Sequence, residues 1–168
     1  REAVLNGVNA VGTVFNAVRF SGAEVLNADL SGADMTEARL ANADFSGTKL
    51  DSAILVKAKM GETEFTRSSM KEVDLTGARG SGVKLNHVDL TGAVLREADL
   101  TEADFGGSNL AGADLTRADL AGASLEGAVL TKAIFVHASL DEVELSETQL
   151  SDMITESAEE DTDLVEDV

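Results

Sequence analysis

The feature that most constrains the fold of this chain is a large apolar side chain at every fifth position. From Leu5 to Leu150, the 30 positions numbered in multiples of five hold 18 Leu, six Phe, three Met and one Val, with Ala10 and Gly80 as exceptions. Two residues before each of them, all 30 positions hold a small residue (Ala, Val, Thr or Ser). An unbroken short repeat of this kind is typical of a solenoid, in which stacked units share one continuous core.

The five-residue period favours short extended segments over helices. In a helix, apolar positions five apart drift around the axis and bury no single stripe. In an extended segment, a large and a small residue two apart point the same way. Of the 15 Gly, 12 lie two residues after the large apolar position, where a tight turn can demand a positive φ. Each five-residue unit is therefore predicted to form one short side of a coil, and stacked coils are expected to lie about 4.8 Å apart.

The units themselves resemble a known repeat family. Ala98–Glu102 (ADLTE), Ala103–Phe105 (ADF) and Ala113–Arg117 (ADLTR) are similar to the A-(D/N)-(L/F)-X-X pattern of the pentapeptide-repeat family. The resemblance covers residues 3–150. It implies an all-β solenoid, a right-handed quadrilateral β-helix with four units in each coil and about seven and a half coils. Residues 1–150 are therefore expected to form one β-helix domain.

Residues 151–168 leave the five-residue frame, since Met153 stands where a small residue belongs, and they carry eight acidic and no basic side chains. Ser157 and Glu160 have the spacing of a helix capping box. We expect an acidic C-terminal cap, a short helix followed by a disordered tail, with a wholly disordered tail as the alternative. The side chains expected to cover the open end of the stack are Met153, Ile154, Leu164 and Val165.

Composition excludes several classes of function. The 31 acidic and 13 basic residues leave a net charge of −18, which argues against direct binding to nucleic acid or to anionic lipid. The absence of Cys excludes disulfides and thiolate sites, and the absence of Trp and Tyr, with only six Phe, argues against a base-stacking platform. No apolar run approaches 18 residues, so no membrane insertion is expected.

No catalytic or metal-binding constellation can be assembled from the repeat. His87 and His137 are 50 residues apart, which is two and a half coils and places them on opposite faces. A core filled by two side chains per unit leaves no cleft for a substrate. We therefore expect no enzyme, no catalytic residue, no cofactor and no metal. At Gly80 a core side chain is missing, so a local bulge or bend is expected there, with Met60 and Met70 as adaptable fillers and a ligand pocket as the alternative.

Residues twenty apart are expected to stack on one face, which allows the sequence to be arranged in columns. One outward column consists of Arg19, Arg39, Lys59, Arg79, Asp99, Asp119 and Ser139. Its four stacked cations repel one another unless a neighbour, for which Glu62 is a candidate, or a partner neutralises them. The column is interpreted as a docking stripe for an anion or an acidic protein. The alternative is a solvated face whose charges contribute little.

A second outward column alternates β-branched and acidic residues: Val14, Asp34, Ile54, Asp74, Val94, Asp114 and Ile134. The apolar members Val14, Ile54, Val94 and Ile134 are candidates for a partly apolar docking strip. The alternative is that β-branched residues suit an exposed sheet and that the Asp residues belong to the repeat pattern.

Taken together, these features predict a non-enzymatic structural or scaffold module that presents flat β-helix faces to a protein partner. The alternative is an acidic nucleic-acid mimic, as in the quinolone-resistance members of the family, which bind the type II topoisomerase DNA gyrase. Those members are commonly Phe-rich and interrupted by loops, whereas this chain is Leu-rich and uninterrupted. Its acidity is also uneven, because residues 133–168 hold 12 acids and no bases.

The expected oligomeric state is a monomer or a homodimer. Acidic C-terminal ends would repel each other at low salt, so the N-terminal coil is the expected dimer contact. Its apolar residues are Val8, Ala10, Val11 and Val14. The resemblance leaves the location open between the cytoplasm and a compartment such as the thylakoid lumen.

Overall fold

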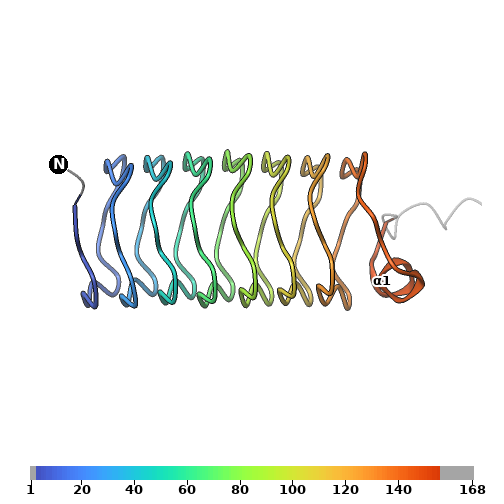
Figure 1. Ribbon diagram of the computed structural model, residues 1–168, viewed down its shortest axis with the longest axis horizontal. Helices are drawn as coiled ribbons and strands as arrows, with labels where there is room; N and C mark the ends of the chain where they lie inside the picture. The colour runs from blue at the N-terminus through green and yellow to red at the C-terminus, as the bar shows by residue number, and fades with distance from the viewer. Residues whose placement is uncertain (1–2, 156–168) are drawn as a thin grey trace, which may run out of the picture.

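The chain winds into a square coil that repeats every twenty residues. The structure, a computed structural model, describes residues 3–155. Parallel bridges join outward residues twenty apart in four columns, one on each side of the coil, as in Val4–Glu24 and Asn9–Asp29. Figure 1 shows the coils stacked along one axis, with the helix α1 at the C-terminal end. The predicted all-β quadrilateral solenoid is confirmed.

One hydrogen-bonding rule holds the coils together. From Leu5 to Leu120, the N–H at every fifth position donates to the carbonyl 19 residues ahead, as from Leu55 to Asp74 at 2.7 Å. The N–H of each outward residue donates 21 residues back, as from Asp74 to Ala53 at 3.0 Å. Each corner is closed within its own coil, as by the N–H of Ala58 on the carbonyl of Leu55 at 3.0 Å. Every side is therefore fixed to the coil before it and the coil after it.

The corners impose a positive φ on every unit, whichever residue stands there. All 28 corner positions from Gly7 to Glu142 have φ between 53° and 68°, and 16 of them are not glycine. The turn can therefore force Lys57 (φ 57°) or Glu62 (φ 56°) into a region that L-residues rarely adopt. Glycine is favoured at the corner but not required, because hydrogen bonds from both neighbouring coils hold the backbone in place.

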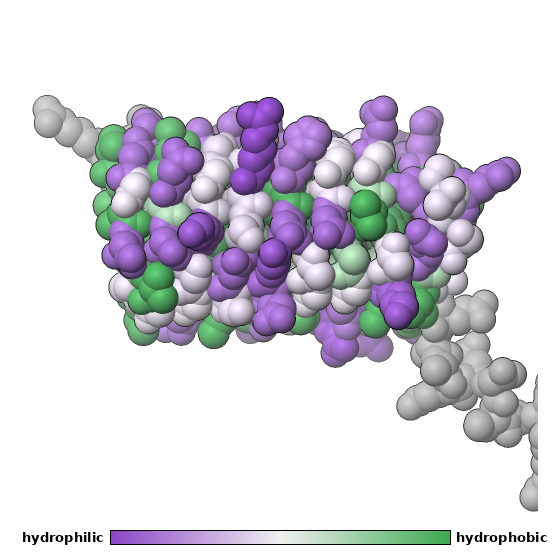
Figure 2. Space-filling model, turned by 90° about the horizontal axis from the view of Figure 1, so that it is seen from below, coloured by the Kyte–Doolittle hydropathy of each residue, from purple (hydrophilic) through white to green (hydrophobic). Residues whose placement is uncertain are grey.

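The core consists of two rows of side chains that point inward on all four sides. The large row holds the apolar residues at every fifth position, and the small row holds the Ala, Val, Thr or Ser residues two positions before them. From Phe20 to Phe135 these side chains are buried almost without exception. The first coil is less enclosed, since its inward residues Leu5, Val8 and Phe15 are only half-buried. Figure 2 shows hydrophobic side chains gathered at this end of the face it draws, while polar side chains cover most of the rest.

Gly80 leaves no gap in the core. A Cβ added to Gly80 would lie 3.1 Å from the terminal methyl carbon of Met60 and 3.3 Å from Val83 Cγ1, so neighbouring side chains already fill the space. The ladder is undisturbed, since the N–H of Gly80 donates to Asp99 at 2.7 Å. The expected bulge or bend is therefore wrong. The Met60 side chain is long enough to fill the space, so the backbone does not need to shift.

The regular coil ends earlier than the five-residue period of the sequence. Helix α1 spans Glu147–Asp152, before the expected boundary at residue 150, and Ser146 and Gln149 form its capping box. In a regular coil the carbonyl of Ala128 would accept the N–H of residue 149. Here the side-chain amide of Gln149 donates to it at 3.1 Å, and to the carbonyl of Leu125 at 2.8 Å.

Beyond α1 the chain returns to the stack. Met153 is 8% exposed and packs against the core, and Ile154 forms a parallel bridge with Ile134. These two residues lie where the sequence placed them, over the end of the last coil. The expected capping box at residues 157–160, together with Leu164 and Val165, lies outside the described residues.

Two buried hydroxyl groups in the small row have no hydrogen-bond partner in the described part of the chain, those of Ser68 and Ser108. By contrast, the hydroxyl of Thr48 donates to the carbonyl of Val25 at 2.5 Å. An unpaired buried hydroxyl is costly, and alanine is the usual residue in this row.

We expect Ser108→Ala to raise the free energy of unfolding by about 1 kcal/mol, measured by urea denaturation. The control Thr48→Ala should lower it, and a loss of stability in Ser108→Ala would contradict the prediction.

Candidate functional site

The first outward column forms a continuous charged ladder on one side of the solenoid. Its cations, called the basic row here, are Arg19, Arg39, Lys59 and Arg79, and parallel bridges join each to the next. The same ladder continues through Asp99 and Asp119 to Ser139. The structure thus brings the four predicted basic residues together, at about 4.8 Å per coil.

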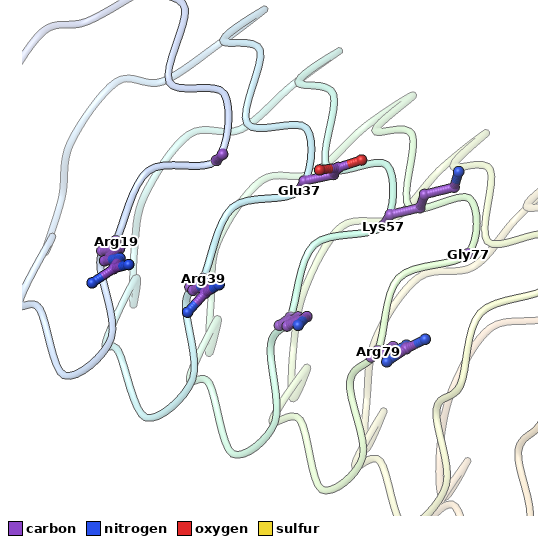
Figure 3. Close-up of a pocket in the computed structure, with 8 residues that line it drawn as sticks. Arg19, Glu37, Arg39, Lys57, Gly77 and Arg79 are labelled. Carbon is purple, nitrogen blue, oxygen red and sulfur yellow. The ribbon is translucent and has the colours of Figure 1, made fainter.

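A shallow groove of about 550 Å³ runs beside the basic row. Its other wall is the neighbouring corner row, which consists of Ala17, Glu37, Lys57 and Gly77. Figure 3 shows Arg19, Arg39 and Arg79 in one line along the axis, and Glu37, Lys57 and Gly77 in a second line beside it. Sequence reasoning missed Glu37 and Lys57. A list of corner residues twenty apart would have found them.

The groove carries an excess of positive charge that no neighbour neutralises. Four ion pairs occur within residues 3–155, and none of them involves a lining residue of the groove. Five cations and one carboxylate line it, which leaves four net positive charges on a chain whose total is −18. This local reversal of sign distinguishes the groove from the rest of the surface.

The expected neutralising neighbour, Glu62, lies in a different groove. It lines a second hollow together with Asp44, Glu64 and Lys84. There the Glu64 carboxylate accepts a hydrogen bond from Lys84 at 2.6 Å and raises the pKa of the ammonium group, with a smaller contribution from Glu62. Residue 62 stands at the corner that follows Met60, so its side chain belongs to the next face. The expectation that it offsets the basic row is wrong.

The two carboxylates of the ladder are only partly engaged. Asp99 Oδ1 accepts hydrogen bonds from the N–H of Thr101 at 3.3 Å and from its hydroxyl at 3.0 Å. Asp119 Oδ1 accepts the N–H of Ala121 at 3.1 Å. Both residues are exposed, and within the described chain neither forms an ion pair. Each therefore presents a charged oxygen to whatever approaches this face.

The second column is assembled as expected, but carboxylates interrupt it. Val14 is 68% and Ile54 40% exposed, whereas Val94 and Ile134 are half-buried. Bridges join them alternately through Asp34, Asp74 and Asp114, and continue to Ile154, which the sequence had placed only in the cap. Val14, Ile54, Val94 and Ile134 are thus two coils apart from one another and form no continuous patch, and Ile154 lies one coil beyond Ile134.

The acidic residues of the second column have a local structural role. Asp34 Oδ1 accepts the hydroxyl of Thr36 at 2.7 Å and its N–H at 3.0 Å, and these bonds hold the pKa of Asp34 below its usual value. The Asp74 carboxylate binds Thr76 in the same way. These bonds start the corner turn, which is a familiar role of Asp. The geometry therefore favours the structural interpretation of this column over a docking strip.

The described residues contain no side-chain cluster placed to bind a metal ion. His87 and His137 occupy corners on different sides of the coil, as the period predicts. Within residues 3–155 no cluster of three or more His, Asp or Glu side chains is placed to hold a metal ion. In the same range, the structure contains no helix with the length and apolar character needed to span a bilayer.

Comparison with sequence families gives one clear match. A family model described as pentapeptide repeats, matched in eight copies, covers residues 1–36, 28–67, 43–79, 58–96, 81–117 and 118–152. A sequence search of curated proteins gives no significant match.

Comparison with solved structures finds several proteins of similar architecture. QnrB1, a plasmid-mediated fluoroquinolone resistance protein, is 17% identical, with 90% of this chain and 94% of that chain covered and a TM-score of 0.42. A pentapeptide repeat protein of the Arabidopsis thaliana thylakoid lumen is 30% identical over 73% of this chain and 72% of that chain, with a TM-score of 0.41. HetL, from the cyanobacterium Nostoc sp., is 25% identical over 89% and 87% of the two chains, with a TM-score of 0.30.

Proposed function

The chain belongs to the pentapeptide-repeat family of right-handed quadrilateral β-helices, and from this premise we propose that it is a non-enzymatic scaffold whose basic groove docks an acidic protein surface. Proteins of this family are generally structural or interaction modules rather than enzymes. The observation that carries the proposal is the set of five cations in the groove, none of which forms an ion pair in residues 3–155.

The spacing of these cations supports an acidic partner. Like charges stacked about 4.8 Å apart repel one another, and a carboxylate placed between two of them relieves that repulsion. Three of the four members of the basic row are arginines, whose planar guanidinium group binds a carboxylate through two parallel hydrogen bonds. The partner therefore gains most where its own acids follow the direction of the row.

The rigidity of the ladder supports a docking role. The backbone around Arg39, Lys59 and Arg79 is bonded to both neighbouring coils: the N–H of Arg39 donates to Val18 of the preceding coil, and the N–H of the adjacent Leu40 donates to Lys59 of the following coil, both at 2.8 Å. Binding then orders only side chains and no backbone, which lowers the entropic cost of association. A flat face with fixed charges suits recognition of another folded surface.

The proposal is tested by affinity capture from a lysate of the source organism, with captured proteins identified by mass spectrometry. The triple variant Arg39→Glu, Lys59→Glu, Arg79→Glu reverses the basic row. A matched control, Lys49→Glu, Arg67→Glu, Lys132→Glu, reverses three cations that have no ion pair in the described chain and lie outside the groove. Circular dichroism checks that all proteins are folded.

We expect an acidic protein to be retained by the wild type and the control and to be lost from the triple variant. If the triple variant retains the same proteins, the groove is not the docking site. Capture of a type II topoisomerase by all three proteins alike would favour the acidic nucleic-acid mimic instead.

A further inference from the structure

The ladder that contains the basic row is complementary to itself, and we propose that two copies of this chain dock on it side by side, with their solenoid axes antiparallel. This inference rests on the proposed function, since it uses the same groove, and it names a second copy as an occupant. Along the axis the ladder consists of four cations, two carboxylates and one hydroxyl: Arg19, Arg39, Lys59, Arg79, Asp99, Asp119 and Ser139.

The antiparallel arrangement follows from a two-fold axis that lies between the two faces and crosses the solenoids at right angles. Such an axis leaves each column opposite itself and reverses the order of the coils. When it passes between the coils of Arg79 and Asp99, Arg79 faces Asp99 of the second copy and Lys59 faces Asp119 of the second copy. Symmetry doubles both pairs, so the ladder forms four ion pairs and no like-charge contact.

Other registers of the same face are less favourable, because they add like-charge contacts to the ion pairs that they form. Moving the two-fold axis onto the coil of Arg79 places this residue against itself, and moving it one half-coil further places Lys59 against Arg79. A parallel arrangement sets every coil opposite its own copy, so that all four cations meet like charge. It would also bring together the two C-terminal ends, where residues 133–168 hold 12 acids and no bases. The antiparallel arrangement separates these ends.

The periodicity of the fold allows all the pairs to form at once. Both surfaces are the same face of the same chain, so their coil spacing is identical and alignment of one ion pair aligns the others. The charges are available, because all four residues of the two pairs are exposed and have no ion pair in the described chain. On one side of the ladder the residues just before the corner positions are small, which allows close approach: Ser21, Ala41, Gly61, Ser81, Thr101 and Ala121. At the corner positions themselves Glu62 and Glu102 face Gly122 and Gly82 of the second copy.

The other corner row contains one unfavourable contact, which the symmetry repeats once. In the proposed register Glu37 faces His137 of the second copy and Gly77 faces Glu97 of the second copy, but Lys57 faces Arg117 of the second copy. The guanidinium of Arg117 is already 3.8 Å from the carboxylate of Glu97 in its own chain, which offsets part of its charge. The four ladder pairs therefore dominate the electrostatics of this face.

The test is sedimentation equilibrium of the full chain at low ionic strength, with a reciprocal charge swap. We expect the wild type to form a dimer that dissociates as salt is added, because exposed ion pairs are screened. Arg79→Asp and Asp99→Arg each replace two ion pairs by two like-charge contacts, so each should raise the dissociation constant at least roughly tenfold. The double variant restores the pairs with their signs exchanged, and it should return within about threefold of the wild type.

The two single variants also separate facing charges from overall charge. Asp99→Arg lowers the net negative charge of the chain, so it would strengthen association if only the overall charge mattered; the proposed contact requires it to weaken association. Lys49→Asp is the matched control, because Lys49 occupies the same outward position on the opposite side of the coil. It should leave the dissociation constant unchanged.

A wild type that stays monomeric at low salt and at about 0.5 mM protein would overturn the proposal, since even millimolar affinity would be visible there. A double variant as weak as the single variants would overturn it as well. Either result leaves the basic groove free for an acidic partner, so the proposed function survives it. Conversely, a confirmed dimer together with a lysate capture that ignores the basic row would refute the proposed function alone.

Discussion

Replacing Phe65 by alanine is expected to lower the free energy of unfolding by about 3–5 kcal/mol. Phe65 is fully buried in the middle of the stack, and its ring stacks on that of Phe45 with 5.4 Å between centroids. The space left by the ring cannot close easily, because hydrogen bonds fix this side of the coil in both directions. The N–H of Phe65 donates to Lys84 at 2.8 Å, and the N–H of Glu64 donates to Ala43 at 2.9 Å.

Urea unfolding followed by circular dichroism measures this loss, and Phe15→Ala is its matched control. Phe15 belongs to the same inward row but lies in the first coil and is only half-buried. Its replacement should cost less than half as much, since burial determines the transfer free energy that is lost. Equal losses at the two positions would show that the middle of the core is no more tightly packed than its end.

The second large effect is expected from Met60 and Gly80, which share one volume in the core. Met60→Ala alone should lower the free energy of unfolding by about 2–5 kcal/mol, because its side chain fills the space above Gly80. Gly80→Leu alone should cost about 1–3 kcal/mol through overpacking against Met60. In the double variant the new leucine occupies the space that methionine leaves. Its loss of unfolding free energy should therefore be about 1–3 kcal/mol smaller than the sum of the two single losses.

A double-mutant cycle in urea measures this coupling directly. The pair Met70→Ala and Gly80→Leu is a useful control, because Met70 lies in the same inward row but half a coil away from Met60. Additive losses in that pair, and coupled losses in the first, are the expected result. Additive losses for Met60 and Gly80 would show that the methionine does not fill the missing side chain of the glycine.

The five-residue period predicts the fold of this chain well because each unit meets only its neighbours in the stack. Two inward residues and one corner define a side, and four sides define the columns, so the basic row could be identified before any coordinates. The same reasoning placed Met60 beside Gly80. It predicted a bulge nonetheless, since the reach of a flexible methionine side chain is not visible in a repeat pattern.

The errors concentrate at corners and at the end of the stack. At a corner the side chain can belong to either adjoining face, so Glu62 was assigned to the wrong groove and Lys57 was overlooked. At the C-terminal end Leu145 and Leu150 continue the apolar period, but helix α1 begins at Glu147. The reason is a contact far along the chain, from the Gln149 amide to the carbonyls of Leu125 and Ala128. Local periodicity carries no information on such a contact.

The twenty-residue closure of the coil also determines which changes in chain length the molecule tolerates. Removing twenty residues from the middle would shorten the rod by one layer, about 4.8 Å, and return every later residue to its own face. Removing five would preserve the inward rows and the core, yet turn everything downstream by a quarter of a revolution, so that Asp99 and Asp119 would no longer continue the line of Arg79. The rod can thus be lengthened or shortened by whole coils of twenty residues. The inward rows depend on the five-residue frame, whereas the surface columns and core pairs such as Met60 with Gly80 depend on the full twenty-residue coil.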